Sequence, residues 1–465
     1  EQMPRSTLFQ EDLITRYDKP GPLYTSYPPA TEFHQGITES DYRNWARQSN
    51  EEPIPKPLSL YFHIPFCSSI CYYCACNKII TKNRERAEPY LQDLYREIEL
   101  QSTLFDHDRE VRQLHWGGGT PGFLSRLQTQ QLMEKIAAHF SLEGKWDKEY
   151  SIELDPRVME AGGIAHLRQL GFNRISLGVQ DLDEKVQIAV NRVQSLEATR
   201  AVIEDARLHG FRSINIDLIY GLPHQTLQSF SDTLRRIIEL APDRIAMYNY
   251  AHLPHRFPPQ RRIKEEDLPS SAAKLDILHS AIDQLSAAGF DYIGMDHFAK
   301  PDDELAIAQR NRNLHRNFQG YSAHAQCDSI GFGVSAISQV HDNFSQNTNS
   351  LEEYHSCLEQ SRLPVVRGYQ SHDDDLLRRE IIQQLVCHFR LDTRLIGKAW
   401  NIDFSEYFAD ELERLADMEK DGLLTFDKDQ IIVLEPGRLL VRNICMIFDR
   451  YQSAPNVRGA FSRTI

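Results

Sequence analysis

The sequence has no long hydrophobic run and no excess of basic charge. None of its 465 residues lies in an apolar stretch of about 18, so we expect no membrane span. The first residues are charged and lack the apolar core of a secretory signal. A net charge of −14 argues against the broad basic face of a nucleic-acid-binding protein. We therefore expect a cytoplasmic protein that does not act on nucleic acid.

Cysteine is scarce outside one segment. Four of the eight cysteines lie close together, at Cys67, Cys71, Cys74 and Cys76, and the others are isolated. A disulfide framework would spread its cysteines in pairs, so this distribution favours a metal site in a reducing compartment. Hydrophobic content of 41% and charged content of 25% indicate a folded protein, and the length suggests several domains.

Short apolar runs alternate with segments of helical period between residues 58 and 300. Repeated strand–helix units build a parallel sheet, because each crossover helix returns the chain to the same edge. Six or seven units are too few for a closed eight-fold barrel, so the pattern predicts an α/β fold with an open, partial (β/α)6 barrel. We expect functional residues at the carboxyl ends of its strands. The runs are 58–65, 111–117, 149–156, 174–180, 213–221 and 244–254, with 290–298 as a candidate seventh.

The segments on either side of the barrel have a different character. Residues 1–57 contain the Pro-rich stretch KPGPLYTSYPPA, which predicts an extended N-terminal arm. Residues 58–300 form the predicted barrel, and 301–369 are expected to extend it toward the substrate pocket. Residues 370–465 combine helical segments with a short strand pair. This pattern indicates a mainly helical, winged-helix-like C-terminal domain.

The cysteine-rich segment directly follows the first predicted strand. It places Cys67, Cys71 and Cys74 at C-x-x-x-C-x-x-C spacing. Three thiolates on one loop can each bind one iron of a four-iron cubane, which leaves the fourth iron without a protein ligand. An open iron can chelate S-adenosylmethionine (SAM), and an electron from the cluster then releases a 5′-deoxyadenosyl radical. The protein would hold that radical against one substrate C–H bond.

A structural zinc site is the alternative for these cysteines. Zinc usually takes four ligands, often from two separated knuckles, and the sequence has no second knuckle. Cys76 follows Cys74 too closely for easy binding of one tetrahedral ion. The turn Gly117–Pro121 ends the second predicted strand and supports the cluster, because glycines let backbone groups approach a ligand closely.

In these motifs the chain resembles the oxygen-independent coproporphyrinogen III oxidases, a branch of the radical-SAM superfamily. The resemblance implies oxidative decarboxylation of two propionates of coproporphyrinogen III to vinyl groups, giving protoporphyrinogen IX in anaerobic haem biosynthesis. It covers nearly the whole chain and includes the strings GPLYTSYP, SLYFHIPFC, CYYCACNK, LHWGGGTP, SIELDPR, GVQDLDEKVQ, NIDLIYGLP, YNYAHLP, GMDHFAKPDDELA, LHRNFQGY, GVSAIS and RNICMIFD.

The resemblance also implies a [4Fe-4S] cluster and two SAM molecules per chain. Cys67, Cys71 and Cys74 are the implied cluster ligands, and Cys76 is expected at the edge of the substrate pocket. The cluster-bound SAM is expected to contact Tyr61, Gly118, Glu153 and Ile337. The second SAM is expected to contact Tyr73, Gly119, Thr120, Gln180, Arg192, Asp217 and Ala251.

Several of these residues have plainer interpretations. Strand-end acids such as Glu153 could merely cap a neighbouring helix, and Arg192 could form a surface ion pair. Tyr61 and Ile337 could equally be core residues. The residue types nevertheless suit SAM, because carboxylates and amides can bind ribose or amine groups and a guanidinium can bind a carboxylate.

The four carboxylates of the substrate require basic partners. Each candidate could equally be a solvated surface charge. His63 and Lys78 flank the cluster segment and could tune its potential or touch the substrate. Leu23 departs from the family, whose N-terminal motif usually has Arg at this position. The basic candidates are Arg261, Arg262, Lys264, Arg310 and Arg316.

A haem chaperone of the same superfamily is the main alternative function. Such relatives share the barrel and three cysteines, but typically have Phe in place of Cys76 and a different motif in place of His315–Tyr321. The long N-terminal arm also favours the oxidase. The negative net charge disfavours a radical-SAM enzyme that acts on tRNA. The resemblance further implies a low-potential, flavodoxin-like electron donor and a monomer.

Overall fold

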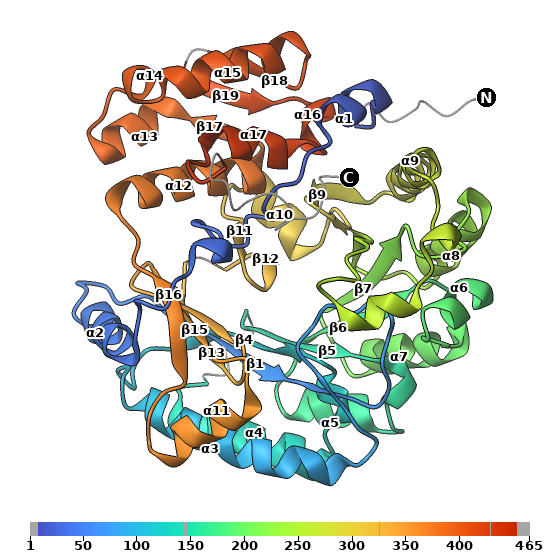
Figure 1. Cartoon of the computed structure of the whole chain (residues 1–465), viewed down its shortest axis with the longest axis vertical. Helices are drawn as coiled ribbons and strands as arrows, with labels where there is room; N and C mark the ends of the chain where they lie inside the picture. Colours follow the sequence, from blue (N-terminus) through green and yellow to red (C-terminus); the bar gives the residue numbers. More distant parts are fainter. Residues whose placement is uncertain (1–7, 143–146, 325, 428, 453–465) are drawn as a thin grey trace.

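A large mixed sheet forms the body of the protein. The computed structural model describes residues 8–142, 147–324, 326–427 and 429–452. Within this part of the chain, twelve strands form one sheet in the order β16-β15-β14-β13-β1-β4-β5-β6-β7-β8-β10-β9 (Figure 1). Among the described residues, no helix has both the length and the apolar composition needed to cross a bilayer.

The six predicted strands lie parallel and in chain order within this sheet. Each is paired with the next, which confirms the predicted partial (β/α)6 barrel. Alternate side chains along β7 are buried in the core, as expected of a strand with one face against the covering helices. The strands are β1 (Leu58–Ile64), β4 (Val111–Gly118), β5 (Glu149–Leu154), β6 (Arg174–Gln180), β7 (Ser213–Tyr220) and β8 (Arg244–Asn249).

Helices connect the strands and cover the outer face of the sheet. In α8, Phe230, Leu234 and Ile237 form a buried stripe, while the Thr226 and Ser229 side chains cap its first turn reciprocally. The connecting helices are α3 (Glu88–Ser102), α4 (Arg126–His139), α5 (Gly163–Gln169), α6 (Glu184–Ala189), α7 (Leu196–Leu208), α8 (Leu227–Glu239) and α9 (Ser271–Ala287).

Residues 290–298 do not add a seventh parallel strand. They form β9 (Asp291–Gly294) and β10 (His297–Ala299), which pair antiparallel with each other, and β10 pairs antiparallel with β8. The two residues between β9 and β10 are too few for the crossover that a parallel pair needs. This prediction was therefore wrong at that edge of the barrel.

The other edge carries strands that the sequence did not reveal. β13 (Asp328–Phe332) pairs parallel with β1, as a seventh parallel strand. Three antiparallel strands extend the sheet from it: β14 (Ile337–Val340), β15 (Asn343–Asn347) and β16 (Val365–Tyr369). A hairpin of β11 (His315–Asn317) and β12 (Gly320–Ser322) precedes them, after α10 (Glu304–Arg310).

The C-terminal segment forms a separate helical layer with a small sheet, drawn orange to red in Figure 1. Its order of helix, strand, helices and hairpin is that of a winged helix. Residues 404–426 form α14, α15 and β18, and Gly422, with a positive φ of 76°, follows the end of α15. The elements are α12 (Asp373–His388), β17 (Arg390–Asp392), α13 (Thr393–Trp400), α14 (Phe404–Tyr407), α15 (Ala409–Lys420), β18 (Leu424–Asp427), β19 (Gln430–Val433), α16 (Glu435–Arg438) and α17 (Val441–Phe448).

The N-terminal arm packs against this C-terminal layer. Tyr24 and Tyr27 are buried in the same core as α12 and α17. Four side chains bind backbone carbonyls of the arm, so it is held by its main chain. The bonds are Arg442 to Gly21 (2.7 Å), Arg316 Nε to Leu23 (3.1 Å), Arg379 Nε to Tyr27 (2.7 Å) and Asn443 to Tyr17 (2.6 Å). Three further helices flank the arm and the sheet edge: α1 (Glu11–Tyr17), α2 (Glu39–Asn50) and α11 (Leu351–Glu359).

We expect Leu23→Arg to leave stability nearly unchanged. The Leu23 side chain is 41% exposed, and only its carbonyl is used to fix the arm. Restoring the family's usual residue should therefore change the free energy of unfolding, measured with urea, by no more than about 0.5 kcal/mol. Tyr24→Ala is the contrasting variant and should lose about 3 to 5 kcal/mol, because Tyr24 is fully buried. A large shift for Leu23→Arg would show that this side chain takes part in arm packing.

Candidate active site

The cysteine loop lies at the carboxyl ends of the parallel strands. Two short parallel strands, β2 (Phe66–Cys67) and β3 (Ile79–Ile80), bring the start and the end of the loop together. The loop is tied to the chain after α6, since Tyr72 N donates to Val190 O at 2.9 Å and the Asn191 amide to Ile70 O at 2.7 Å. The cysteine loop therefore lies at the edge where functional residues are expected.

Basic side chains surround the cysteine sulfurs. The guanidiniums of Arg157 and Arg192 reach Cys71 Sγ at 3.8 and 3.6 Å. Asp155 holds both arginines in place, at 2.6 Å from Arg157 and 3.5 Å from Arg192. Lys78 Nζ donates to the carbonyls of Cys74 and Cys76 at 3.3 and 3.4 Å. These positive charges would offset the negative charge of three thiolates.

Cys74 and Cys76 differ in how readily they ionise. The Cys76 thiol donates a hydrogen bond to Cys74, which lowers the pKa of Cys74 and raises the pKa of Cys76. Burial, aided by the neighbouring cysteines, raises the pKa of Cys67 to about 12. This hydrogen bond favours the thiolate form at Cys74 over Cys76.

The cysteine set fits a cluster better than a single ion. In the described part of the chain, no three His, Cys, Asp or Glu side chains converge on one metal position. Tetrahedral zinc takes four ligands on one ion, whereas each thiolate of a cubane binds a different iron. Three thiols on one loop therefore fit a cubane that keeps one iron open.

The glycine turn packs so closely against its neighbours that it leaves no room for a side chain. Gly118 has a φ of 114°, and a Cβ there would lie 2.7 Å from His63 Nδ1. A Cβ on Gly119 would lie 2.7 Å from the carbonyl oxygen of Phe66, and one on Gly117 would lie 2.8 Å from Glu153 Oε1. Glycine is required here because the turn approaches the cysteine loop and the Glu153 carboxylate so closely.

The residues expected at the cluster-bound SAM lie side by side along this edge. Glu153 accepts from Gly118 N at 3.3 Å and from His115 at 2.9 Å. Burial disfavours the charged form of Glu153, but these hydrogen bonds outweigh it and lower its pKa. Tyr61 stacks on His115 with ring centroids 5.8 Å apart. Tyr61 is also paired with Gly331, which contacts Ile337 at the start of β14.

Three residues expected at the second SAM have buried polar atoms that lack a hydrogen-bond partner in the described residues. These atoms are Thr120 Oγ1, Gln180 Oε1 and Arg192 Nε. Gln180 follows a bulge in β6 and has a φ of 69°, a strained conformation for a residue other than glycine. Buried polar atoms are rarely left unpaired, so a ligand that supplies partners fits this position.

Asp217 lies beside this group on β7. It accepts hydrogen bonds from Asn215 at 2.8 Å and from Ser176 at 3.0 Å. Burial nevertheless raises the pKa of Asp217 to about 6, with the nearby charge of Glu153 acting in the same direction. A cationic ligand group would restore the charged form of this carboxylate.

Tyr73 lies in the cysteine loop near Cys71 and Arg192. Gln260 donates to the carbonyl of Tyr73 at 3.1 Å, and Tyr73 packs against a small apolar cluster that includes Tyr250, the residue before Ala251. Ala251 lies two residues beyond the end of β8, whose pairing with β7 stops at Asn249. The sixth strand is therefore shorter than the predicted run 244–254.

Comparisons with known proteins identify the family. The profile described as the radical SAM superfamily matches residues 61–237. The oxygen-independent coproporphyrinogen III oxidase of Pseudomonas aeruginosa is 52% identical over 457 residues, which cover 98% of each chain. This chain belongs to the oxygen-independent coproporphyrinogen III oxidases. The corresponding oxidase of Escherichia coli K12 is 48% identical over 97% of this chain and 98% of the relative.

A solved structure of this oxidase family agrees with the fold. The coproporphyrinogen III oxidase from Escherichia coli, described as a radical SAM enzyme, superimposes with a TM-score of 0.90 at 47% identity. The match covers 95% of this chain and 99% of that chain. Membership of the radical SAM superfamily implies a [4Fe-4S] cluster and SAM, and membership of the oxidase family places the chain in haem biosynthesis.

The basic candidates of this oxidase differ in their surroundings. Arg261, Arg262 and Lys264 are exposed on the segment after β8, and Arg310 is exposed on α10 near Asp291. Arg316 is the buried member of the five. Its guanidinium carbon lies 4.8 Å from the Tyr321 ring, and its Nη1 has no hydrogen-bond partner among the described residues.

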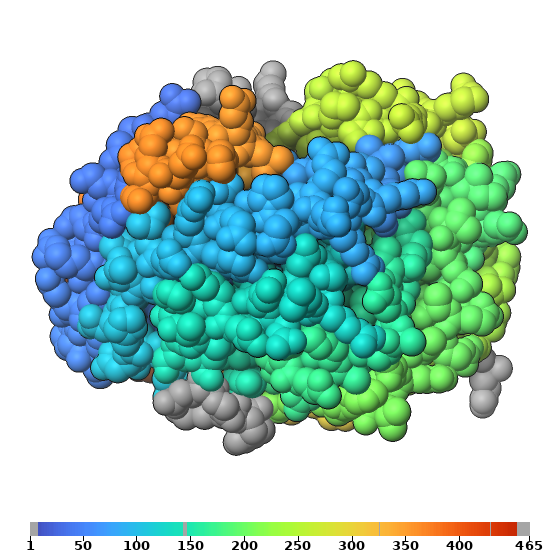
Figure 2. Space-filling model, turned by 90° about the horizontal axis from the view of Figure 1, so that it is seen from below, coloured from blue at the N-terminus to red at the C-terminus, as the bar shows by residue number. Residues whose placement is uncertain are grey.

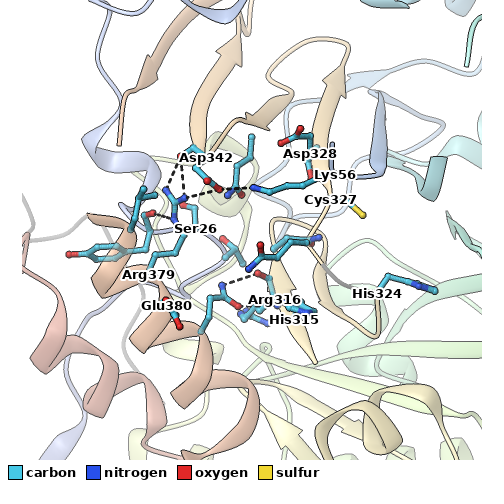
Figure 3. Close-up of a pocket in the computed structure, with 18 of the residues that line it drawn as sticks. Ser26, Lys56, His315, Arg316, His324, Cys327, Asp328, Asp342, Arg379 and Glu380 are labelled. Carbon is cyan, nitrogen blue, oxygen red and sulfur yellow. Dashed lines mark hydrogen bonds and ion pairs between the residues drawn. The ribbon is translucent and has the colours of Figure 1, made fainter. Parts of the chain in front are cut away.

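Arg316 also lines a cavity of about 420 Å³ between β13–β15, the β11–β12 hairpin, α12 and the arm (Figure 3). Lys56 and Arg379 line the same cavity and are paired with Asp342 at its wall. A second, smaller cavity of about 140 Å³ inside the barrel is lined by Glu153 and Asp217. Both cavities share Gln113 and Asn317, so they adjoin each other.

Three residues of the site were not singled out from the sequence. Arg157 follows Asp155 by two residues, a local signal that could have revealed it. His115 and Gln260 gave no such signal, because their partners Glu153 and Tyr73 come from distant parts of the chain.

Proposed function

We propose that this oxidase converts coproporphyrinogen III to protoporphyrinogen IX with a cluster on Cys67, Cys71 and Cys74. One observation carries the proposal: the cysteine loop lies at the same edge of the barrel as buried polar atoms of Thr120, Gln180 and Arg192 that have no partner among the described residues. When bound, the cluster and SAM supply a radical that removes a hydrogen atom from the β-carbon of a propionate.

We assign the two SAM molecules to two adjoining groups of residues. Tyr61, Gly118, Glu153 and Ile337 would hold the first, against the stacked His115. The second would be held by Tyr73, Gly119, Thr120, Gln180, Arg192, Asp217 and Ala251. The support for a second molecule is that Arg192 and Asp217 offer opposite charges, which suit the carboxylate and ammonium groups of an amino acid.

We place a carboxylate of the substrate in the 420 Å³ cavity. Arg316 supports this assignment, because its buried Nη1 lacks a partner among the described residues while its Nε holds the arm. Lys56 and Arg379 add positive charge to the same wall. The adjoining barrel cavity leads from there to Glu153 and Asp217, so one substrate could reach both regions.

The remaining assignments concern the protein as a whole. We propose the four parts 1–57, 58–300, 301–369 and 370–465, supported by the separate hydrophobic core around α12 and α17. We further propose a monomer in the cytoplasm, served by a flavodoxin-like electron donor. All eight cysteines lie in the described part of the chain and form no disulfide, which suits a reducing compartment.

Anaerobic turnover tests the proposed reaction. Reconstituted protein is incubated with coproporphyrinogen III, SAM and dithionite, and the products are read by mass. A product that has lost one carboxyl group should appear first and a product that has lost two should follow, with SAM consumed. Tight haem binding without any decarboxylation would assign the chain to the chaperone class instead.

Cys76→Ser should keep its iron content and turn over about tenfold more slowly. Three thiolates already supply the cluster, and a fourth would block the iron that SAM needs. Serine at position 76 can still donate to Cys74 but lacks the thiol. Iron analysis and turnover are measured together. Iron loss equal to that of Cys74→Ser would contradict the ligand assignment, and unchanged turnover would mean that Cys76 only packs.

A further inference from the structure

Three segments near the cysteine loop contain no acidic residue. They are residues 53–84, which include the loop, residues 185–196 and residues 252–264. The whole chain has 66 acidic residues among 465 and a net charge of −14, so acids would be expected in each segment. These three segments therefore carry a net positive charge, opposite in sign to the net charge of the whole protein.

Contacts join these three segments into one surface. Tyr72 N donates to Val190 O at 2.9 Å, and Arg262 reaches the Tyr72 hydroxyl at 3.4 Å. The Arg262 guanidinium carbon also lies 5.2 Å from the centre of the Tyr72 ring. Figure 2 shows blue residues of the early chain beside yellow-green residues of the segment after β8.

No exposed side chain of these three segments is acidic. We name seven of their exposed basic or apolar side chains the cluster-side patch. Nearby acids lie at its rim: Glu160 pairs with Arg84 at 2.5 Å, and Glu266 lies 3.8 Å from Lys264. Within the cysteine loop, Cys76 and Asn77 are exposed, and the other two segments contact this loop at Tyr72. The patch consists of Ile80, Lys82, Ile188, Val193, Arg256, Arg261 and Arg262.

We propose that the cluster-side patch docks an acidic protein that carries single electrons. This proposal rests on the proposed function, in which the cluster must receive an electron from outside for each SAM that it cleaves. One electron would pass from the carrier to the cluster, so the carrier is oxidised and the cluster reduced by one electron, with no bond or proton moved.

Charge explains why the partner would be acidic and why it would bind here. An acidic carrier is repelled by most of this protein, whose net charge is −14, and is attracted by the patch. The repulsion elsewhere would orient the carrier toward the cluster. Ile188 and Val193 are 60% and 61% exposed and would supply the apolar contact that a transient interface needs.

The test uses the double variant Arg261→Glu/Arg262→Glu in anaerobic, reconstituted protein. Photoreduced flavodoxin is the acidic protein probe, and dithionite is the small reductant. With flavodoxin, the rate at low carrier concentration should fall by about tenfold or more, and its dependence on salt should weaken. With dithionite, the variant should stay within about twofold of the parent protein, because no docking is needed.

Direct binding gives a readout that does not depend on turnover. Titration of flavodoxin should show a dissociation constant about tenfold weaker for the double variant, as expected for lost charge pairs. Arg235→Glu is the matched control, since Arg235 is exposed on α8 outside the patch. It should change neither flavodoxin binding nor either rate.

Three outcomes would overturn the proposal. Equal loss of turnover with both reductants would assign Arg261 and Arg262 to substrate or SAM. Unchanged flavodoxin binding in the double variant would show that the carrier docks elsewhere. Absence of decarboxylation by the parent protein even with dithionite would overturn the proposed function, and with it the docking proposal that rests on it.

Discussion

Cys71→Ser protein purified without oxygen should contain almost no iron, whereas the parent chain should hold about four irons. A serine hydroxyl does not ionise near neutral pH, so one iron of the cubane loses its ligand. Cys71 is also the sulfur that Arg157 and Arg192 approach, so its loss removes that contact, while Asp155 still pairs with both guanidiniums. Iron and sulfide analysis and the visible spectrum measure the loss, and decarboxylation should fall below detection.

The same result is expected for Cys67→Ser and Cys74→Ser. Cys357→Ser is the control, because Cys357 lies on α11 and belongs to the core of the sheet edge. This variant should keep the iron of the parent protein. Stoichiometric zinc without iron after anaerobic reconstitution of the parent would contradict the cluster, and a full iron content in Cys71→Ser would contradict this ligand.

Asp217→Ala should reduce the number of SAM molecules bound at equilibrium from two to one. A hydrogen bond to a charged group contributes about 1.5 to 3 kcal/mol, so the second site should weaken by about 10- to 100-fold. The cluster and the first SAM should be unaffected, since Glu153 and Gly118 keep their contacts. Decarboxylation should fall at least as far as SAM binding at the second site.

Two further variants separate binding from structure. Arg192→Gln should weaken the second site in the same way, because it removes the opposite charge. Asp232→Ala, at an exposed position of α8, should leave both sites intact. SAM binding is measured in anaerobic protein with a full cluster. If the parent and Asp217→Ala proteins each bind one SAM, no stable second site exists, and Asp217 has a structural role.

The sequence by itself determined the parts of this protein that depend on local spacing. Cys67, Cys71 and Cys74 lie on one loop directly after a strand, and Gly117–Gly119 end the next one. These features need only a short window of chain, because strand period and turn chemistry act between near neighbours. The same holds for the six parallel strands, whose apolar runs and intervening helices recur in order.

Tertiary structure alone decided which residues became neighbours across strands. Ile337 lies 276 positions after Tyr61, yet β13 brings the two together through Gly331. The hydrogen bond between His115 and Glu153 likewise depends on the pairing of β4 with β5. Strand pairing joins residues that are far apart in the chain, and a single sequence carries no local signal for it.

Burial separated residues of identical type. Arg316 and Arg261 were equal candidates for the substrate, but one is buried beside a cavity and the other is exposed near the cluster loop. The sequence also did not determine the direction of pairing at residues 290–298, because their apolar pattern suits a parallel or an antiparallel strand. The sequence determined which reactive side chains are present and the order of the helices and strands. Only the packing of distant segments decided which charged side chains face substrate, cofactor or solvent, because burial and electrostatic partners arise from the whole fold.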